Sequence, residues 1–398
     1  MFKPWLNKSF ALFCILGFLF IPLTFDGLDF QYQLTRFLFL QPVAWIQNHF
    51  FTGAIKNIDF SSDTIGLNIL LCLLLATACI VITLLDLFTI KSYKVIPLFR
   101  FLAAYYIAFI LLKYGVDKIV KRQFYLPEPN ILYAGFGSLT RDTLFWSTLG
   151  TSRTYSLITG GMEALTAILI LVKRTRIAGL FLSVLILANI LFINFSFDIS
   201  VKTFTAFLLL VSVYMVYPYL KSCYAFFIEH KQAQLSPLQL PASRLRKRVN
   251  ILLSVLLVCY VLYPYIRAGN FNDDKAERPF LHGAYGVTRF IMGGDTLHSG
   301  DFPYKRFFIH RNNYIIFQQQ DDTMTDYFFE TDPIQKQLTL RDYDKNTVIV
   351  TYAYTEKTGA LQLRFNNREK WIIESEALNW KALPALQGGT HYTVDEIK

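Results

Sequence analysis

One apolar run, Thr64–Phe88, constrains this chain more than any other feature, because Asp86 is its only charged residue. About 20 consecutive apolar residues cross the roughly 30 Å hydrocarbon core of a bilayer as an α-helix. A helix satisfies its backbone hydrogen bonds internally, as a segment in hydrocarbon must. Further apolar runs recur along the first two thirds of the chain: Ser9–Phe25, Leu98–Tyr114, Tyr155–Val172, Ile177–Phe195, Thr203–Tyr219 and Val249–Ile266. The sequence therefore predicts a mainly α-helical, polytopic membrane bundle of about seven transmembrane helices.

The composition supports a membrane protein joined to a water-exposed part. Hydrophobic residues make up 53% of the 398 residues and charged residues 17%, against about 25% charged residues in an average soluble protein. The formal net charge is +10, which in a membrane protein reflects cytoplasmic loops that face anionic lipid. No dense Lys/Arg patch is interleaved with aromatic residues, so we expect membrane lipids as partners and no nucleic acid.

The distribution of Lys and Arg predicts the orientation, because cytoplasmic loops are enriched in these residues. Basic residues gather at the N-terminus and in the segments 91–100, 173–176 and 244–248. We therefore expect a bacterial inner (plasma) membrane protein with a cytoplasmic N-terminus and a periplasmic, extracytoplasmic C-terminal domain. The first apolar run lacks a small-residue cleavage site, which favours an uncleaved span over a signal peptide. The segment 113–153 departs from the rule, since this orientation places its six basic residues outside.

Beyond Arg267 the chain changes from long apolar runs to alternating polar and apolar residues. Alternation with a period of two indicates strands with one buried face. Turn-type residues separate the segments at intervals typical of a small barrel or sandwich, and none of the five cysteines lies in this part. The segments are 305–310, 314–317, 337–341, 347–354, 361–365 and 370–374. We expect an exported antiparallel β domain without disulfides that can contact other envelope proteins.

These changes along the sequence divide the chain into five parts. They are an N-terminal two-span membrane segment (1–97), a four-helix membrane unit (98–226), a basic cytoplasmic linker (227–248), a seventh transmembrane helix (249–266) and the exported β-rich domain (267–398). Within the first part, residues 26–63 are too polar to span the membrane and too apolar for a free loop. We expect them to form short amphipathic helices at the outer interface.

Ionisable and amide side chains at the edges of the apolar runs are the candidates for chemistry, because a charge in hydrocarbon is costly and faces a partner. Lys113 with Asp117 and Asp198 with Lys202 have i,i+4 spacing, which places each pair on one face of a helix. Glu163 is the deepest carboxylate, and we expect Lys113 or Lys202 to pair with it, close to the two amides. The full set of candidates is Lys113, Asp117, Lys118, Glu163, Asn189, Asn194, Asp198 and Lys202.

Two interpretations of this set stay open. It forms either a proton-handling or ligand-binding pocket open to the outer side, or a self-satisfied network of ion pairs and amide hydrogen bonds that locks the helices together. Among the 37 Phe and 23 Tyr residues, a minority would line a site for a flat lipophilic ligand such as a quinone. The histidines fit no metal-ligand spacing, so we expect no metal site and take His282, His298 and His310 as ordinary surface residues.

Several short motifs follow one another in the segment 99–226: Lys113-Tyr-Gly-Val-Asp-Lys118, Trp146-Ser-Thr-Leu-Gly150, Gly160-Gly-Met-Glu163, Arg174-Thr-Arg-Ile-Ala-Gly179 and Asn194-Phe-Ser-Phe-Asp198. In order and spacing they resemble the DoxX-like family of integral membrane proteins, which includes DoxD-type subunits and, more distantly, the HTTM domain. The resemblance covers about a third of the chain. It implies a four-helix membrane unit, here enlarged by two spans before it and an exported domain after it.

Some members of the DoxX-like family are subunits of quinone-linked sulfur oxidation. The resemblance therefore implies an accessory subunit that binds a lipophilic or quinone-type partner and presents an exported β domain. The alternative is a redox or proton-coupled membrane enzyme subunit, such as part of a quinone-linked oxidoreductase, centred on Glu163, Asp198 and Lys202. The sequence has no cysteine pair beside these residues, which argues against a thiol-redox role.

Overall fold

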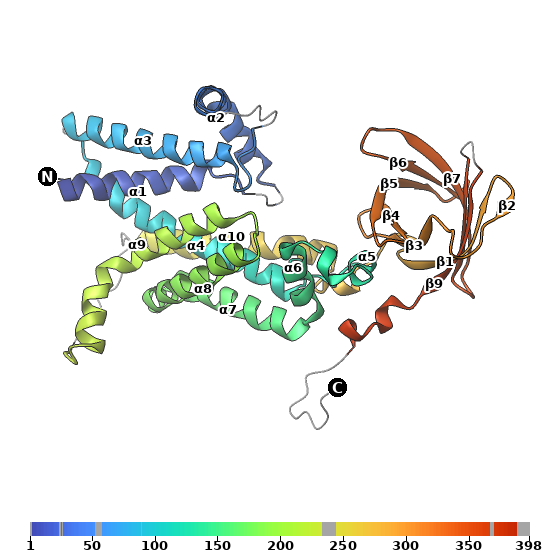
Figure 1. Ribbon diagram of the computed structural model, residues 1–398. Coiled ribbons are helices and arrows are strands. Elements are labelled where there is room, and N and C mark those ends of the chain that lie inside the picture. Colours follow the sequence, from blue (N-terminus) through green and yellow to red (C-terminus); the bar gives the residue numbers. More distant parts are fainter. Residues whose placement is uncertain are drawn as a thin grey trace. The chain divides into compact units, whose positions relative to one another are not determined.

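The fold is described from a computed structural model of residues 1–398 (Figure 1). The structure describes residues 2–23, 25, 27–51, 58–88, 90–232, 244–366 and 370–387. Contacts divide the chain into two compact units. The helical unit comprises Met1–Gln123 and Thr154–Phe271, and the β unit comprises Phe124–Arg153 and Asn272–Lys398.

The helical unit confirms the predicted membrane bundle. Its helices are α1 (Phe2–Phe20), α2 (Asp29–Phe50), α3 (Ile65–Leu87), α4 (Val95–Ile119), α7 (Arg153–Leu171), α8 (Arg176–Ser196), α9 (Lys202–Phe227) and α10 (Arg244–Ala268). Within the described residues, six segments are long and apolar enough to cross a membrane: Ile65–Leu87, Ser92–Ile119, Arg153–Leu171, Arg176–Ser196, Lys202–Phe227 and Arg248–Lys275. A shorter apolar helix, Pro4–Phe20, precedes them.

The N-terminal segment differs from the prediction in two respects. Helix α1 ends at Phe20 rather than at residue 25, and the Gln31 side chain of α2 binds carbonyl groups at this end. The Gln31 amide donates to the carbonyl oxygens of Leu19 and Ile21 at 3.0 and 2.8 Å. Helix α2 is one continuous helix of 22 residues, with Pro42 inside it, and it replaces the short helices expected between residues 26 and 63.

The β unit is a closed antiparallel barrel. Its strands are β1 (Gly283–Met292), β2 (Asp295–Thr296), β3 (Tyr304–Ile309), β4 (Tyr314–Gln319), β5 (Met324–Asp332), β6 (Gln337–Arg341), β7 (Thr347–Thr355), β8 (Ala360–Phe365) and β9 (Ile372–Leu378). From β3 onward each strand pairs with the next, while β1 pairs with both β2 and β3. β1 also pairs with β9, with Ala284 opposite Leu378, and this pairing closes the sheet (Figure 1).

The barrel interior follows from the alternation read in the sequence. Inward residues such as Phe307, Phe317, Leu363 and Ile373 are almost completely buried in one apolar cluster. The strands β1, β2 and β5 were not predicted. Two glycines interrupt the alternation of β1, β2 has two residues, and β5 carries five acidic or threonine residues beside its aromatics, so none of them shows a clear period of two.

The connection between α4 and α7 belongs to the β unit, whereas the sequence analysis placed it in the four-helix unit. It contains α5 (Pro129–Leu132) and α6 (Arg141–Thr151). Tyr133 stacks on Phe308 of β3, with 5.8 Å between the ring centroids. The Gln318 side chain of β4 donates to the Tyr133 carbonyl oxygen at 3.2 Å. The connection therefore packs on the outer face of β3 and β4.

Candidate functional site

Helices α4 and α7 touch backbone to backbone at two glycines. A Cβ atom on Gly160 would lie 2.5 Å from the carbonyl oxygen of Gly115, and a Cβ on Gly115 would lie 2.8 Å from that of Gly160. Small residues permit such close crossing of membrane helices. The glycines of the two motifs quoted above therefore have a packing role that any larger side chain would disturb.

This crossing brings Lys118 beside Glu163. The ammonium group lies 2.7 and 2.6 Å from the two carboxylate oxygens, and both side chains are less than a tenth exposed. The prediction that Lys113 or Lys202 pairs with Glu163 is therefore wrong. Lys118 follows Gly115 by three residues and Glu163 follows Gly160 by three, so both side chains project from the turn next to the crossing.

The predicted pair Lys113 and Asp117 is confirmed. The Lys113 ammonium lies 2.6 Å from each carboxylate oxygen of Asp117. Tyr265 of α10 completes the group: its hydroxyl donates to Asp117 and lies 3.2 Å from the Lys113 ammonium. The Lys113 ammonium also lies over the Phe25 ring. This group joins α4 to α10 through buried polar contacts.

A third polar group lies at the turn before α9. Lys202 pairs with Asp198 at 2.7 Å, as its spacing predicted. Asp198 does not lie on the helix, however, because α9 begins at Lys202 and Asp198 has a φ of 54°. Asp63, which was not among the candidates, accepts hydrogen bonds from the backbone N–H groups of Lys202 and Thr203 at 2.8 Å each. Asp63 thus caps α9 at the end where a carboxylate is favoured.

The two amides do not join Glu163. Asn194 is buried and donates to the Thr205 hydroxyl at 2.9 Å, while Asn189 is exposed on α8. In the part of the chain that the structure describes, the hydrogen bonds of Glu163 go to Lys118. The candidate residues therefore form separate groups rather than one pocket.

A groove lies beside the third group. Its volume is about 470 Å³. It is lined by Phe13, Asp63, Leu71, Phe195, Lys202, Thr203, Ala206, Phe207 and Leu210. Phe13 and Phe207 are almost completely buried, whereas Phe195 and Leu210 remain exposed. The lining is mainly apolar, and Asp63, Lys202 and Thr203 are its polar residues.

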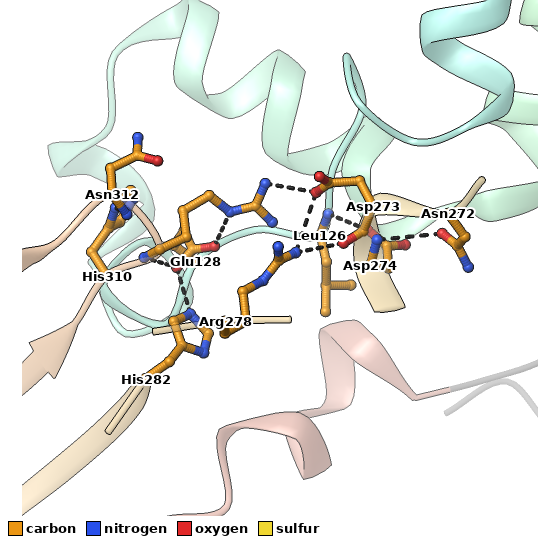
Figure 2. A network of polar contacts seen from close by, with 10 residues as sticks. Leu126, Glu128, Asn272, Asp273, Asp274, Arg278, His282, His310 and Asn312 are labelled. Carbon is orange, nitrogen blue, oxygen red and sulfur yellow. Dashed lines mark hydrogen bonds and ion pairs between the residues drawn. The ribbon is translucent and has the colours of Figure 1, made fainter. Parts of the chain in front are cut away.

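The β unit contains a buried charged cluster that the sequence analysis missed (Figure 2). Glu128, from the connection between α4 and α7, lies 2.8 Å from Nε2 of His282. Arg311 Nε donates to the other Glu128 oxygen at 2.6 Å, and its Nη1 donates to Asp273 at 2.7 Å. Arg278 donates to the same Asp273 oxygen at 3.2 Å. Glu128 thereby ties its segment directly to His282 and Arg311, and through Arg311 to Asp273.

The charge state of this cluster follows from its surroundings. Burial raises the pKa of Glu128, but the hydrogen bond from His282, the charge of His310 and the hydrogen bond from Arg311 outweigh it and lower the pKa to about 2. Burial lowers the pKa of His310 nearby, although the Glu128 charge opposes this. His282 is 9% exposed at its side chain, so the expectation of a surface histidine is wrong for this residue. Both carboxylate oxygens of Glu128 are bound, so the cluster suits a structural role that holds these segments together.

No group of His, Cys, Asp and Glu suited to a metal ion occurs within the described residues. No local pattern could have revealed the Glu128 cluster, because His282 and Arg311 lie 154 and 183 residues further along the chain. The same holds for Asp63, which caps a helix that begins 139 residues later.

Comparison with known proteins gives one match of significance. No protein-family model matches this chain, and no solved structure does. The Bacillus subtilis (strain 168) protein described as uncharacterized protein YwoB is 34% identical to it over 113 residues, which are 28% of this chain and 71% of YwoB. The chain belongs to the family of YwoB. Most of the chain lies outside the part that it shares with YwoB, so this family includes members much shorter than the present chain.

Proposed function

We propose that this protein is a DoxX-like accessory subunit of the bacterial inner membrane that binds a lipophilic, quinone-type partner and presents its β domain to other envelope proteins. The groove beside Asp63 and Lys202 is the observation that carries this proposal. Its volume of about 470 Å³ falls within the roughly 300–1,000 Å³ typical of ligand sites. Such sites combine an apolar lining with a few polar groups that orient the ligand.

The groove matches an elongated molecule with one polar end. An isoprenoid or acyl chain would lie against apolar lining residues such as Phe13, Phe207 and Leu71. A carbonyl oxygen of a quinone-type head would accept a hydrogen bond from Lys202 at the polar end, because an ammonium group has three donors. Two of the residues near that end, Asp63 and Asp198, already hold the ammonium in place.

The way the chain enters and leaves the β unit supports an extracytoplasmic barrel. Residues 124–153 and 272–398 form one compact unit, so both must lie on the same side of the membrane. Four apolar helices, α7 to α10, separate them along the chain, and an even number of crossings returns the chain to the same side. With a cytoplasmic N-terminus, as the basic segments predict, and with α1 crossing the membrane before α3 and α4, this argument favours a periplasmic barrel.

Filling the groove tests the proposal. The Ala206→Trp variant places a large ring in the groove, and the Ala76→Trp variant makes the same change at an exposed position of α3 that does not line it. Both are purified with retained lipid, and bound small molecules are identified by mass spectrometry. A lipophilic compound found with the parent protein and with Ala76→Trp, but lost from Ala206→Trp, supports the proposal. Equal recovery from both variants contradicts it.

A second candidate, a redox or proton-coupled enzyme subunit, is favoured by the buried titratable groups at the end of α4. Lys118 with Glu163 and Lys113 with Asp117 place two ion pairs within two turns of this helix. A Glu163→Gln variant that keeps its thermal stability in detergent and loses proton-coupled quinone reduction in vesicles would favour this candidate. A variant that loses stability would favour a structural role for the pair.

A further inference from the structure

Helix α7 locates one edge of the hydrocarbon layer on the chain. It has 19 residues, which at 1.5 Å per residue span about 28 Å. The hydrocarbon core is about 30 Å thick. A helix of this length that crosses the membrane is no longer than the hydrocarbon core is thick. Its first residue, Arg153, therefore lies at the edge of the hydrocarbon.

Helix α6 ends within reach of that edge. Its last residue is Thr151, and only Ser152 separates it from Arg153. Two residues span at most about 7 Å, and the headgroup layer on each side of the core is about 5–7 Å thick. The C-terminal end of α6 therefore lies in the headgroup layer.

The beginning of the same connection is held at that level. A Cβ on Gly150 would lie 2.2 Å from the carbonyl oxygen of Tyr125, so the end of α6 packs directly on the chain that leaves α4. The Trp146 ring lies 5.5 Å from the ring of Phe124. Both ends of the connection therefore meet at the membrane surface, and Trp146 lies where they meet.

The side chains of α6 and the turn before it are only partly covered. Gly150 is the one buried residue of α6, and Leu144, Phe145 and Leu149 are partly exposed. Phe136, in the turn before α6, is 79% exposed. Arg141, at the first position of α6, is also exposed. Apolar and aromatic side chains beside a basic residue are the composition of segments that lie in the interface of a bilayer.

We propose that α6 and the Phe136 turn form a membrane anchor of the β unit that lies in the lipid interface. Phe136 inserts at the boundary between headgroups and acyl chains, Trp146 lies at headgroup level and Arg141 contacts a lipid phosphate. The partner is the glycerophospholipid surface of the leaflet on the barrel side. Because Tyr133 of the same connection packs on Phe308 of the barrel, the anchor and the barrel belong to one unit. The inference uses the membrane crossing of α7 and does not depend on a ligand in the groove.

A photo-crosslinking amino acid tests the anchor in the full chain. Benzoylphenylalanine replaces Phe136 in one variant and Tyr343 in another. Tyr343 lies between β6 and β7 and is also 79% exposed, so it is a matched control for exposure and aromatic character. Both proteins are reconstituted in vesicles of phosphatidylethanolamine and phosphatidylglycerol, illuminated and analysed by mass spectrometry.

Lipid adducts at position 136 several-fold above those at position 343 are the expected result. Equal adduct yields at the two positions, or adducts of position 136 with another polypeptide in place of lipid, would overturn the proposal. Where the variant at position 136 does not accumulate, benzoylphenylalanine replaces Phe145 and lipid adducts are measured there. Absence of lipid adducts there overturns the proposal as well.

Discussion

Lys118 and Glu163 form a buried ion pair in which each partner lies three residues beyond the glycine where its helix touches the other. The glycines set the distance between the helices, and the charged residues occupy the next turn. Separating a buried pair by removing one partner leaves the other charge without compensation. The contact therefore fixes both the register and the spacing of α4 and α7.

The Glu163→Gln substitution is expected to lower the free energy of unfolding by about 3–5 kcal/mol, the range for breaking a buried ion pair. Thermal unfolding in detergent measures the effect. Replacing both partners with apolar residues, as in Lys118→Met with Glu163→Leu, should recover most of the loss, because no unpaired charge remains. An unchanged midpoint in the single variant would show that the pair does not stabilise the bundle.

Gly160→Ala should destabilise the bundle by about 1–3 kcal/mol, the usual range for overpacking, because the new Cβ would lie 2.5 Å from the Gly115 carbonyl oxygen. Gly161→Ala is the matched control, since a Cβ there meets nothing within 4 Å. The control should gain up to about 1 kcal/mol from the better helix propensity of Ala. Opposite shifts of the unfolding midpoint in the Gly160→Ala and Gly161→Ala variants would identify the crossing, and equal shifts would refute it.

Tyr265→Phe removes the hydroxyl that donates to Asp117 and leaves the ring in place. A hydrogen bond to a charged group contributes about 1.5–3 kcal/mol, so the variant should unfold at a lower temperature. Tyr263→Phe, at a 59% exposed position of the same helix, should not. Similar behaviour of the two variants would indicate that α10 is not held through Asp117.

Acid should weaken the β unit through Glu128. Its pKa of about 2 lies below the ordinary value of 4.5, so the ionised form is favoured by folding. This contribution is complete above about pH 4.5, is lost as the pH falls toward 2, and amounts to roughly 3 kcal/mol at neutral pH. Glu128→Gln should therefore lower the protease resistance of residues 272–387 at pH 7 and remove most of its loss between pH 4.5 and 2.

The control for Glu128 is Glu356→Gln, because Glu356 is exposed in the turn between β7 and β8. This variant should keep both the resistance at pH 7 and its decline in acid. If Glu128→Gln declines with the same pH profile as the parent protein, another group causes the acid sensitivity.

Three of the six basic residues in the segment 113–153, which contradict the usual charge distribution, are buried. Lys113 and Lys118 are buried against Asp117 and Glu163, and Lys121 is 1% exposed. Charges that are paired inside the bundle do not act as free loop charges during insertion. The segment therefore presents fewer accessible positive charges than its composition suggests.

Local patterns made the helices, the i,i+4 pair of Lys113 with Asp117 and six of the strands predictable, because each depends on residues a few positions apart. The partner of Glu163 was not predictable, since Lys118 lies 45 residues away and depends on where two glycines cross. Asp198 lies outside α9 because Asp63 caps the helix at Lys202, a contact across 139 residues. The charged cluster around Glu128 depends on still longer separations.

The pairing of β1 with β9 has a consequence for how the protein is made. These strands join residues such as Ala284 and Leu378, so the barrel has no complete ring until its last strand has been synthesised. Until then, β1 and β8 each expose an edge of unpaired N–H and C=O groups, which readily recruits strands of other chains. Tyr133 and Glu128 are synthesised much earlier than the barrel residues that they contact, so these contacts also form late. The barrel should therefore be most prone to wrong strand pairing in the interval before β9 closes it.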